Sequence, residues 1–314
     1  MSGGKNEHAG VVPILAAGVL WGTIGLFVKQ LDACGSTPEL TSLLRVFFAF
    51  VIMTVISVSC LGWRALLMGR KTLFTCVLLG FVCHGIYNIF YSFAVTLAGV
   101  AVSAVLLNVA PIVTMLCAVF LYGEGINAQK IIAIILDVIG CVITATNGSL
   151  SLQDMSIAGI LCGIAAGVCY AMTAILGRFA ADQSDPMVMS TYSYLFATIF
   201  LTVWMRPWTA TFSLNGGIIF WSLLFALIPT AIAYLLYYRG LQNLRETSKV
   251  PVIASVETVV AAMIGALLYQ ERLSAIGLTG VLLVLVSIVV MNARIDAKKK
   301  TESRSDDLQK VIRA

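Results

Sequence analysis

The stretch YNIFYSFAVTLAGVAVSAVLLNVAPIVTMLCAVFLYGE, from Tyr87 to Glu124, decides the fold of this chain because the chain contains a second copy of it. That copy, YLLYYRGLQNLRETSKVPVIASVETVVAAMIGALLYQE, runs from Tyr234 to Glu271. The two copies align without a gap and share tyrosines near their start, evenly spaced valines in the middle, and a tyrosine and a glutamate at the end. The chain therefore consists of two related halves.

The similarity between the halves extends to the segments that precede these copies. The aligned pairs are Trp21 with Tyr170, Lys29 with Arg178, and Pro38 with Pro186. This alignment gives each half five apolar spans. Because five is an odd number, the second half must enter a membrane from the side opposite to the first. The result is the inverted repeat that many secondary transporters use.

The composition places these spans in lipid. Hydrophobic residues make up 60% of the chain and charged residues only 11%, which excludes an ordinary soluble domain. A membrane span needs roughly 20 apolar residues. The predicted spans lie near 11–31, 39–61, 73–94, 99–122, 129–146, 156–179, 186–205, 216–238, 248–269 and 274–292. The sequence thus predicts an all-α integral membrane protein whose ten transmembrane helices form two inverted five-helix repeats.

Ten spans place both termini on one side of the membrane, and the basic residues select the side. With a cytoplasmic N-terminus, the outer loops keep only Lys29, Arg206 and Arg272, as the positive-inside rule requires. We therefore expect a multi-pass protein of the plasma membrane with both termini in the cytoplasm. The expected parts are a cytoplasmic N-terminal tail over 1–10, repeats over 11–147 and 148–292, and a cytoplasmic C-terminal tail over 293–314.

Other classes of protein fit the sequence poorly. The net charge of +5 is spread over short loops and a tail, with no basic face for nucleic acid. The eight cysteines and two histidines lack the close spacing of a metal site or a disulfide framework, and we interpret the cysteines as packing residues. The sequence also contains no metalloprotease motif and no phosphate-binding glycine loop. We therefore predict no enzyme activity, no cofactor and no bound metal.

Three segments resemble the drug/metabolite transporter superfamily, and specifically its EamA-like branch of ten-span transporters. They are Val19-Leu-Trp-Gly-Thr23, the segment from Pro38 to Arg45, and the segment from Pro111 to Glu124. The resemblance covers residues 11–292. It implies a compact ten-helix fold with a central cavity lined by spans 1, 3, 4, 6, 8 and 9. Spans 5 and 10 would then lie outside the cavity.

Polar and aromatic residues gather in the spans that should line this cavity. Four of them, His84, Tyr87, Asn88 and Tyr91, follow one another at helical spacing in span 3. Such residues share one face of a helix, and a polar face in lipid should turn inward. We expect the substrate-binding residues to be Trp21, His84, Tyr87, Asn88, Tyr91, Asn108, Tyr170, Tyr234 and Tyr238. Alternatively, the amides of Asn88 and Asn108 could join neighbouring helices, and His84 could satisfy a backbone carbonyl.

Charged residues within spans are the second group of candidates, since each costs about 2.5 to 3.5 kcal/mol on insertion scales. Glu257 lies near the middle of span 9. An unpaired carboxylate there would be protonated or would need a cation or hydrogen-bond donors. We predict that Glu257 exchanges a proton and couples it to transport, the alternative being a structural hydrogen bond to a neighbouring span. Asp137 in span 5 is equally unusual, and its role stays open.

Two further patterns have structural interpretations. We expect the long side chains of Lys29, Arg45 and Arg178 to reach water at span ends. Glycines recur at four-residue intervals at Gly18 and Gly22 in span 1 and at Gly159, Gly163 and Gly167 in span 6. Such spacing allows the backbones of two helices to approach closely.

Together these features favour a secondary transporter that exports small polar or amphipathic metabolites, such as amino acids, by alternating access. The direction and substrate class follow from the resemblance. One alternative is a proton-coupled exporter of cationic or lipophilic compounds, and another is a channel or a structural membrane protein. The expected partners are a small-molecule substrate, the lipid bilayer and, with coupling, a proton. The sequence leaves the oligomeric state open, a homodimer included.

Overall fold

The computed structural model describes residues 7–148, 156–208, 214–270 and 273–293. Within these ranges, helices are the only regular secondary structure. Most of the two expected tails, over 1–10 and 293–314, lies outside the described residues, as do Glu271 and Arg272.

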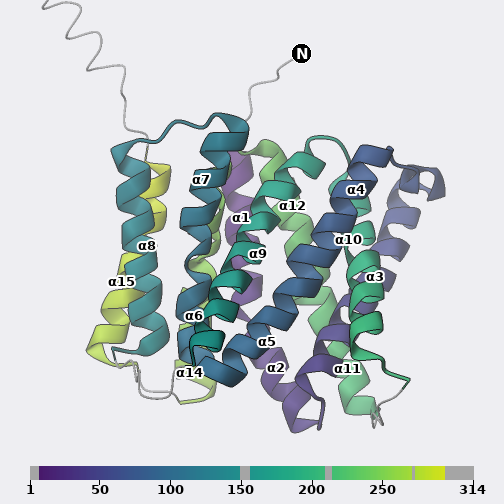
Figure 1. Cartoon of the computed structure of the whole chain (residues 1–314), viewed down its shortest axis with the longest axis horizontal. Coiled ribbons are helices and arrows are strands. Elements are labelled where there is room, and N and C mark those ends of the chain that lie inside the picture. Colours follow the sequence, from purple (N-terminus) through teal and green to yellow (C-terminus); the bar gives the residue numbers. More distant parts are fainter. Residues whose placement is uncertain (1–6, 149–155, 209–213, 271–272, 294–314) are drawn as a thin grey trace, which may run out of the picture.

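The described helices form ten candidate membrane spans, which confirms the predicted number. The first half contains α1 (Glu7–Gly22), α2 (Ile24–Ala33), α3 (Pro38–Leu61), η1 (Trp63–Leu66), α4 (Arg70–Leu78), η2 (Leu79–Ile86), α5 (Tyr87–Ala98), α6 (Val100–Leu107), α7 (Ala110–Tyr122) and α8 (Ala128–Thr146). The second half contains α9 (Ile157–Ala181), α10 (Pro186–Met205), α11 (Gly216–Ala226), η3 (Leu227–Ile232), α12 (Ala233–Asn243), η4 (Thr247–Lys249), α13 (Val250–Ala254), α14 (Val256–Leu268) and α15 (Ala275–Asn292). Helix α1 begins and helix α15 ends at the same end of the bundle, which we call the terminal end (Figure 1).

Local sequence signals set the starts of several helices. The side chains of Thr37, Asn127, Asp185, Asn215 and Ser274 each accept a hydrogen bond from a backbone N–H in the first turn of the helix that follows. Short polar side chains at this position satisfy donors that the helix itself leaves unpaired. The start of these helices is therefore a local property of the sequence.

The third and fourth spans of each half are interrupted at matching positions. Spans 3 and 8 contain the π-helical segments η2 and η3, and Pro229 lies inside η3. Spans 4 and 9 break at Asn108, between α6 and α7, and at Ser255, between α13 and α14. Pro111 lies in the first turn of the helix after the first of these breaks. The duplication thus preserved irregular backbone geometry as well as apolar length.

Glycines allow the first span of each half to cross closely over the fourth span of the other half. A Cβ atom on Gly18 of α1 would lie 2.7 Å from the carbonyl oxygen of Ala254, and one on Gly167 of α9 would lie 2.9 Å from that of Leu106. Both distances are too short for a real side chain, so only glycine permits this approach of the backbones. The predicted close packing is confirmed, and it joins the halves beside the two helix breaks.

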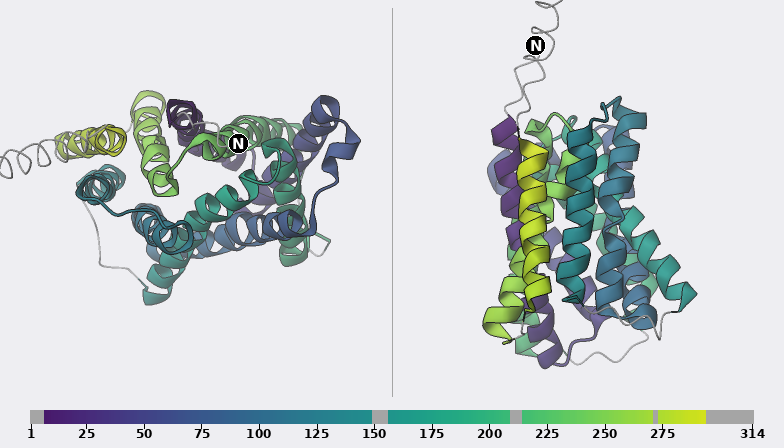
Figure 2. Two further views of the ribbon diagram at one scale, coloured as in Figure 1. Left: turned by 90° about the horizontal axis from the view of Figure 1, so that it is seen from above. Right: turned by 90° about the vertical axis from the view of Figure 1, so that its left-hand side faces the viewer.

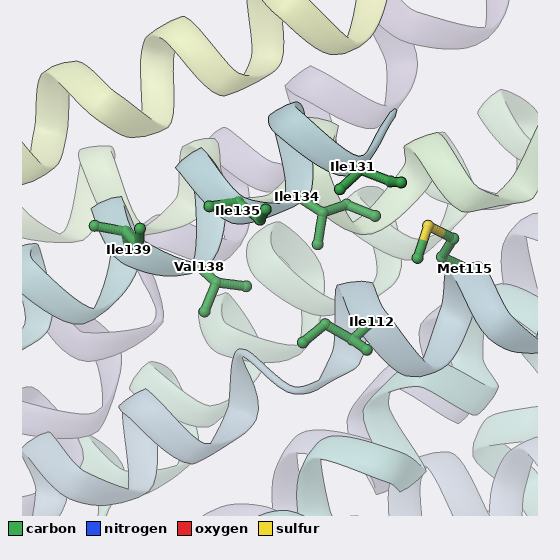
Figure 3. Close-up of a pocket in the computed structure, with 7 residues that line it drawn as sticks. All are labelled: Ile112, Met115, Ile131, Ile134, Ile135, Val138 and Ile139. Atoms are coloured by element: carbon green, nitrogen blue, oxygen red, sulfur yellow. The ribbon is translucent and has the colours of Figure 1, made fainter. Parts of the chain in front are cut away.

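Helices α8 and α15 form a pair at one edge of the bundle (Figures 1 and 2). Their backbones meet at Gly140 and Gly280. This position confirms the expectation that spans 5 and 10 are peripheral. Figure 3 shows an apolar groove between α7 and α8 that contains no polar side chain. Its lining residues are Ile112, Met115, Ile131, Ile134, Ile135, Val138 and Ile139. A wholly apolar groove suits lipid chains and offers no contact to a polar metabolite.

Candidate functional site

Tyr234 of α12 is the centre of an aromatic cluster between the two halves. Its ring centroid lies 5.0 Å from that of Trp21 in α1 and 4.9 Å from that of His84 in η2. Its other ring partners are Tyr194 at 5.9 Å, Tyr237 at 6.2 Å and Tyr238 at 5.9 Å. Because Trp21 and His84 belong to the first half and the remaining rings to the second, the cluster lies where the halves meet.

The π-helical segments place these rings. His84 lies inside η2, and Tyr234 is the second residue after η3. A π-helical turn shifts the direction of the side chains around it and occurs often at functional sites. Helix α10 packs directly on the backbone of η2, because a Cβ on Gly80 would lie 2.6 Å from the carbonyl oxygen of Ser193. This approach brings the ring of Tyr194 to 5.2 Å from that of His84.

A second set of rings leads from the cluster to a carboxyl group. Tyr87 and Tyr91 of α5 are stacked, with centroids 5.8 Å apart, and Tyr87 lies 6.1 Å from Tyr170 of α9. Tyr170 lies 6.4 Å from Trp21, which joins the two sets of rings. The hydroxyl of Tyr170 donates a hydrogen bond to Oε1 of Glu257 at 3.4 Å. Glu257 lies on α14, close to the centre of span 9.

Helix α3 contributes Arg45, which was not among the predicted site residues. Its Nη2 donates to Oδ1 of Asn88 at 3.4 Å, and its guanidinium lies 5.2 Å from the centre of the Phe225 ring. The amide of Asn88 in turn donates to the carbonyl of His84. Arg45 is partly exposed, and its side chain also reaches Asn88, a contact that the sequence did not predict. Its contacts with α5 and α11 connect it to the cluster.

Two opposite charges act on the same phenol groups. Arg45 of α3 and Glu257 of α14 each interact electrostatically with both Tyr87 and Tyr234. Arg45 comes from the first half and Glu257 from the second. The aromatic cluster is thus flanked by a cation from one half and a carboxyl group from the other.

Several polar atoms of the cluster are buried yet form no hydrogen bond with the described residues. They are Nε1 of Trp21, Nε2 of His84, Nε of Arg45 and the hydroxyl oxygen of Tyr238. A buried polar atom without a partner costs roughly 1 to 3 kcal/mol, so packing alone does not favour such a group of atoms. The side chains of Tyr87, Tyr91, Tyr170 and Glu257 are partly exposed. The site therefore combines unpaired polar atoms with accessible side chains, as binding sites do.

Asn108 is the predicted site residue that makes no contact with this cluster in the described structure. Its amide donates to the carbonyl of Ala104 in its own span, at 2.9 Å. The other predicted substrate-binding residues and Glu257 are joined by the contacts above, together with Tyr194, Tyr237 and Arg45. In the described ranges, no group of three or more His, Cys, Asp or Glu side chains could hold a metal ion.

An ion-pair network at the terminal end joins the halves a second time. The carboxylate of Glu124 accepts hydrogen bonds from the backbone N–H groups of Thr247 and Ser248, where span 9 begins. Lys130 lies 3.7 Å from Glu124 and 2.8 Å from Glu246, and Lys249 lies 3.0 Å from Glu246. The side chains of Lys130 and Glu124 are only 3% and 7% exposed. Glu124, which closes the first repeat copy, thus caps the start of the corresponding span in the other half.

The aligned basic residues Lys29 and Arg178 have different surroundings. Arg178 is buried, pairs with Asp182 at 3.1 Å, and donates to the carbonyls of Leu241 and Leu244. The expectation that Arg178 extends to water is therefore wrong, because it fastens α9 to the end of α12. Lys29 lies over the ring of Tyr269, with its Nζ 3.5 Å from the ring centre.

Known proteins match this chain over nearly its whole length. The family model described as the EamA-like transporter family matches residues 8–146 and again residues 157–293. An uncharacterized transporter of Archaeoglobus fulgidus is 25% identical, over 90% of this chain and 95% of its own length. The uncharacterized transporter YxxF of Bacillus subtilis is 23% identical, over 98% and 97%. A solved crystal structure with 16% identity has the same fold, with a TM-score of 0.78 over 91% of this chain and 96% of that one. The chain therefore belongs to the EamA-like transporter family and is a multi-pass membrane transporter.

Proposed function

We propose that this protein is a secondary transporter that exports small zwitterionic metabolites, such as amino acids, by alternating access. One observation carries the proposal: Arg45 of the first half, bonded to Asn88, and Glu257 of the second half, bonded to Tyr170, flank the same aromatic cluster. A zwitterion carries two opposite charges on a small frame, and this site offers a partner for each.

The chemistry of the site supports such a ligand. A guanidinium forms strong, often bidentate hydrogen bonds with a carboxylate, so Arg45 is the partner for the α-carboxylate. Glu257 is the partner for the α-ammonium group. The rings of Trp21 and Tyr234 provide apolar surface for a side chain, and aromatic faces also attract cations. Residues from both halves thus contact one ligand, so that a movement between the halves would expose it to either side.

The ion-pair network of Glu124, Lys130, Glu246 and Lys249 fits alternating access as well. It holds the halves together at the terminal end, and the aromatic cluster holds them together within the membrane. We propose that the network separates when the transporter opens toward that end. Its buried charges would then be hydrated, which offsets part of the cost of breaking the pairs.

A proton-coupled exporter of cationic or lipophilic compounds is the second candidate. The aromatic lining and the central carboxyl of Glu257 favour it, because a cation would need Glu257 and the rings but not Arg45. In that mechanism Glu257 exchanges a proton when water reaches it on either side of the membrane. The two candidates therefore differ in what they require of Arg45.

Counterflow into liposomes that contain the purified protein tests both candidates. We expect amino acids to compete with a labelled amino acid, and their methyl esters, which lack the carboxylate, to compete poorly. Arg45→Gln should make amino acids and their methyl esters compete equally well. Glu257→Gln should make amino acids and their N-acetylated analogues compete equally well. The exposed residues Arg64 and Glu39 provide matched controls, Arg64→Gln and Glu39→Gln. Transport of esters and cations that survives Arg45→Gln would support the second candidate and exclude a zwitterion.

An imposed pH gradient distinguishes proton-coupled transport from simple exchange of substrate. If Glu257 carries the proton, Glu257→Gln should abolish accumulation driven by the gradient and leave counterflow partly intact. Accumulation with unaltered dependence on pH in this variant would reduce Glu257 to a hydrogen-bond acceptor for Tyr170.

We also propose that the terminal end is cytoplasmic and that the protein resides in the plasma membrane, following the distribution of basic residues. Single cysteines at two exposed positions in a cysteine-free background test this orientation. Asp32→Cys should react with an impermeant maleimide added to intact cells, and Leu67→Cys should react only after the cells are opened. The reverse pattern would invert the orientation and the direction of each proposed opening.

A further inference from the structure

Asp137 is a completely buried carboxyl group that the proposed transport site does not use. It lies at the middle of α8, with 0% of its surface exposed. Its neighbours are α15 and the break between α13 and α14. These helices meet at the peripheral edge of the bundle, where α8 and α15 lie in Figure 1.

Among the described residues, the contacts of this carboxyl are two serine hydroxyls and no cation. Ser255, the residue at the break, lies with its Oγ 2.5 Å from Oδ1 of Asp137, and the Oγ of Ser287 in α15 lies 3.0 Å from the same oxygen. Oδ2 of Asp137 is buried and has no hydrogen-bond partner among the described residues. One oxygen of the carboxyl therefore has two partners and the other has none.

Within the part of the chain that the structure describes, the elements around Asp137 supply no positive charge to it. The described parts of α6, α13 and α15 contain no titratable side chain, and α7 contributes only Cys117 and Tyr122. The titratable groups that interact electrostatically with Asp137 are Cys141 on α8 and Glu257 on α14. Lys130, at the start of α8, is paired with Glu124 and Glu246. An ionised Asp137 would thus be a buried anion with a second carboxyl nearby, an arrangement that proteins avoid.

Each serine hydroxyl has a single hydrogen and two acceptors within reach. The Oγ of Ser255 lies 2.7 Å from the carbonyl oxygen of Val252 as well as 2.5 Å from Asp137. The Oγ of Ser287 lies 2.7 Å from the carbonyl oxygen of Val284. If Asp137 carries a proton on Oδ1, it donates to Ser255, and the hydrogen of Ser255 is free to bind the carbonyl of Val252. If Asp137 is ionised, Ser255 must turn its hydrogen to the carboxylate and leave that carbonyl.

We propose that Asp137 is a proton-binding site, separate from the substrate cluster, that controls the break of span 9 at Ser255. The bound proton forms the Asp137 O–H, which donates to Ser255 and leaves the hydrogen of Ser255 on the carbonyl of Val252, so that the last turn of α13 is closed. Release of the proton to water leaves a carboxylate and redirects the hydrogen of Ser255, which loosens that turn. Glu257 lies two residues beyond the break, so the state of Asp137 acts on the position of the carboxyl in the transport site. The proposal is independent of the substrate class.

Infrared difference spectroscopy of the full-length protein in liposomes measures this proton directly. Between about pH 5 and about pH 9, a range that covers perturbed carboxyl groups, we expect the loss of a protonated-carboxyl band typical of an apolar environment. Asp137→Asn should remove this band, and Glu257→Gln and the exposed control Asp32→Asn should retain it. Ser287→Ala keeps the carboxyl and its contact with Ser255, so it should retain the band. A band that persists when Asp137→Asn is combined with Glu257→Gln, or a band that does not titrate in this range, would overturn the proposal.

Hydrogen exchange of the segment 250–258 tests the consequence for the break. At high pH the wild-type segment should exchange several-fold faster than the same segment in Asp137→Asn, because the asparagine amide stays neutral and can still donate to Ser255. At low pH the two proteins should exchange alike. Equal exchange at both pH values would exclude control of the break by Asp137. Replacing sodium by choline should change nothing, and a sodium-dependent difference would instead identify a metal cation as the ligand. None of these measurements uses a transported substrate, so they remain decisive if the proposed function fails.

Discussion

The fourth spans of the two halves, α6–α7 and α13–α14, have the same backbone plan but different polar contacts. Both break at the aligned residues Asn108 and Ser255, and both are crossed at a glycine by the first span of the other half. The break at Asn108 is held locally, by a hydrogen bond to Ala104. The break at Ser255 is held by Asp137, which belongs to a different span.

The ends of these spans differ as well. The first ends in Glu124, which caps the start of the second across the halves. The second carries Glu257 near its centre, bonded to Tyr170. Thus the first copy contributes a carboxylate that contacts the other half from the end of its span, while the second copy contributes one near the middle of its span. After the duplication, both copies kept the crossing of the helices, but their side chains diverged. The first copy, α6–α7, became an anchoring span that holds the other half through Glu124, and the second, α13–α14, became a charged span that carries Glu257.

The anchoring of the second half by Glu124, at the end of the α6–α7 span, predicts the largest effect on stability. Lys130→Met removes the buried cation shared by Glu124 and Glu246, and leaves one carboxylate almost fully buried without it. We expect a loss in the free energy of unfolding on the order of 3 kcal/mol. Thermal unfolding in detergent measures it, with the exposed residue Lys71 giving the control Lys71→Met. Equal stability of the two variants would mean that the network does not anchor the halves.

The shared backbone plan predicts equal penalties in the two halves. Gly18→Ala and Gly167→Ala each place a Cβ within 3 Å of a carbonyl oxygen, at Ala254 and Leu106 respectively. Each should lower the free energy of unfolding by about 1 to 3 kcal/mol, as overpacking does. Gly25→Ala, where no atom lies within 4 Å of the added Cβ, should be neutral or stabilising in the same assay. A large difference between the first two variants would show that the halves do not cross in equivalent ways.

The two breaks should respond unequally. Ser255→Ala removes a hydrogen-bond partner of the buried Asp137, whose other oxygen is already unpaired, and should cost about 1 to 2 kcal/mol. Asn108→Ala removes a local bond of a partly exposed side chain and should cost less than about 0.5 kcal/mol. Denaturant unfolding of both variants under one condition gives the difference. Similar losses would contradict the view that only the second break is held by another span.

The smallest expected effect is the pH dependence of the network. Burial alone would raise the pKa of Glu246, but the hydrogen bonds and charges of Lys130 and Lys249 outweigh it and hold that pKa below its usual range. The stabilisation is therefore complete above the ordinary glutamate pKa of about 4.3 and is lost as the pH falls through the lowered value. Because Glu246 is 31% exposed, we expect less than about 1 kcal/mol. Melting curves between about pH 6 and about pH 3 should lose this part of their acid sensitivity in Glu246→Gln. An unchanged acid profile would assign the sensitivity to another carboxyl.

Much of the candidate site can be predicted from the sequence, because the direction in which a polar side chain turns depends on its own helix. A tyrosine or a carboxyl within a lipid-embedded helix must turn toward protein or water, which is why Trp21, Tyr87 and Tyr234 could be assigned to the interior. The contacts of Asn108 are the exception. Its neighbours in sequence already satisfy its amide, so its type and position alone did not reveal whether it would reach the cluster.

The sequence by itself determined the ten spans and the inverted repeat, because apolar length, capping residues and the match between two copies are properties of short segments. The tertiary structure decided which distant segments meet. Arg45 was expected to reach water at a span end, and only the tertiary structure shows that it also contacts Asn88 and Phe225. Ser248, which donates to Glu124, and Ser255, which contacts Asp137, each lie more than a hundred residues away from that carboxyl along the chain. No local pattern predicts such contacts, since the approach of one helix to another depends on the packing of the whole bundle.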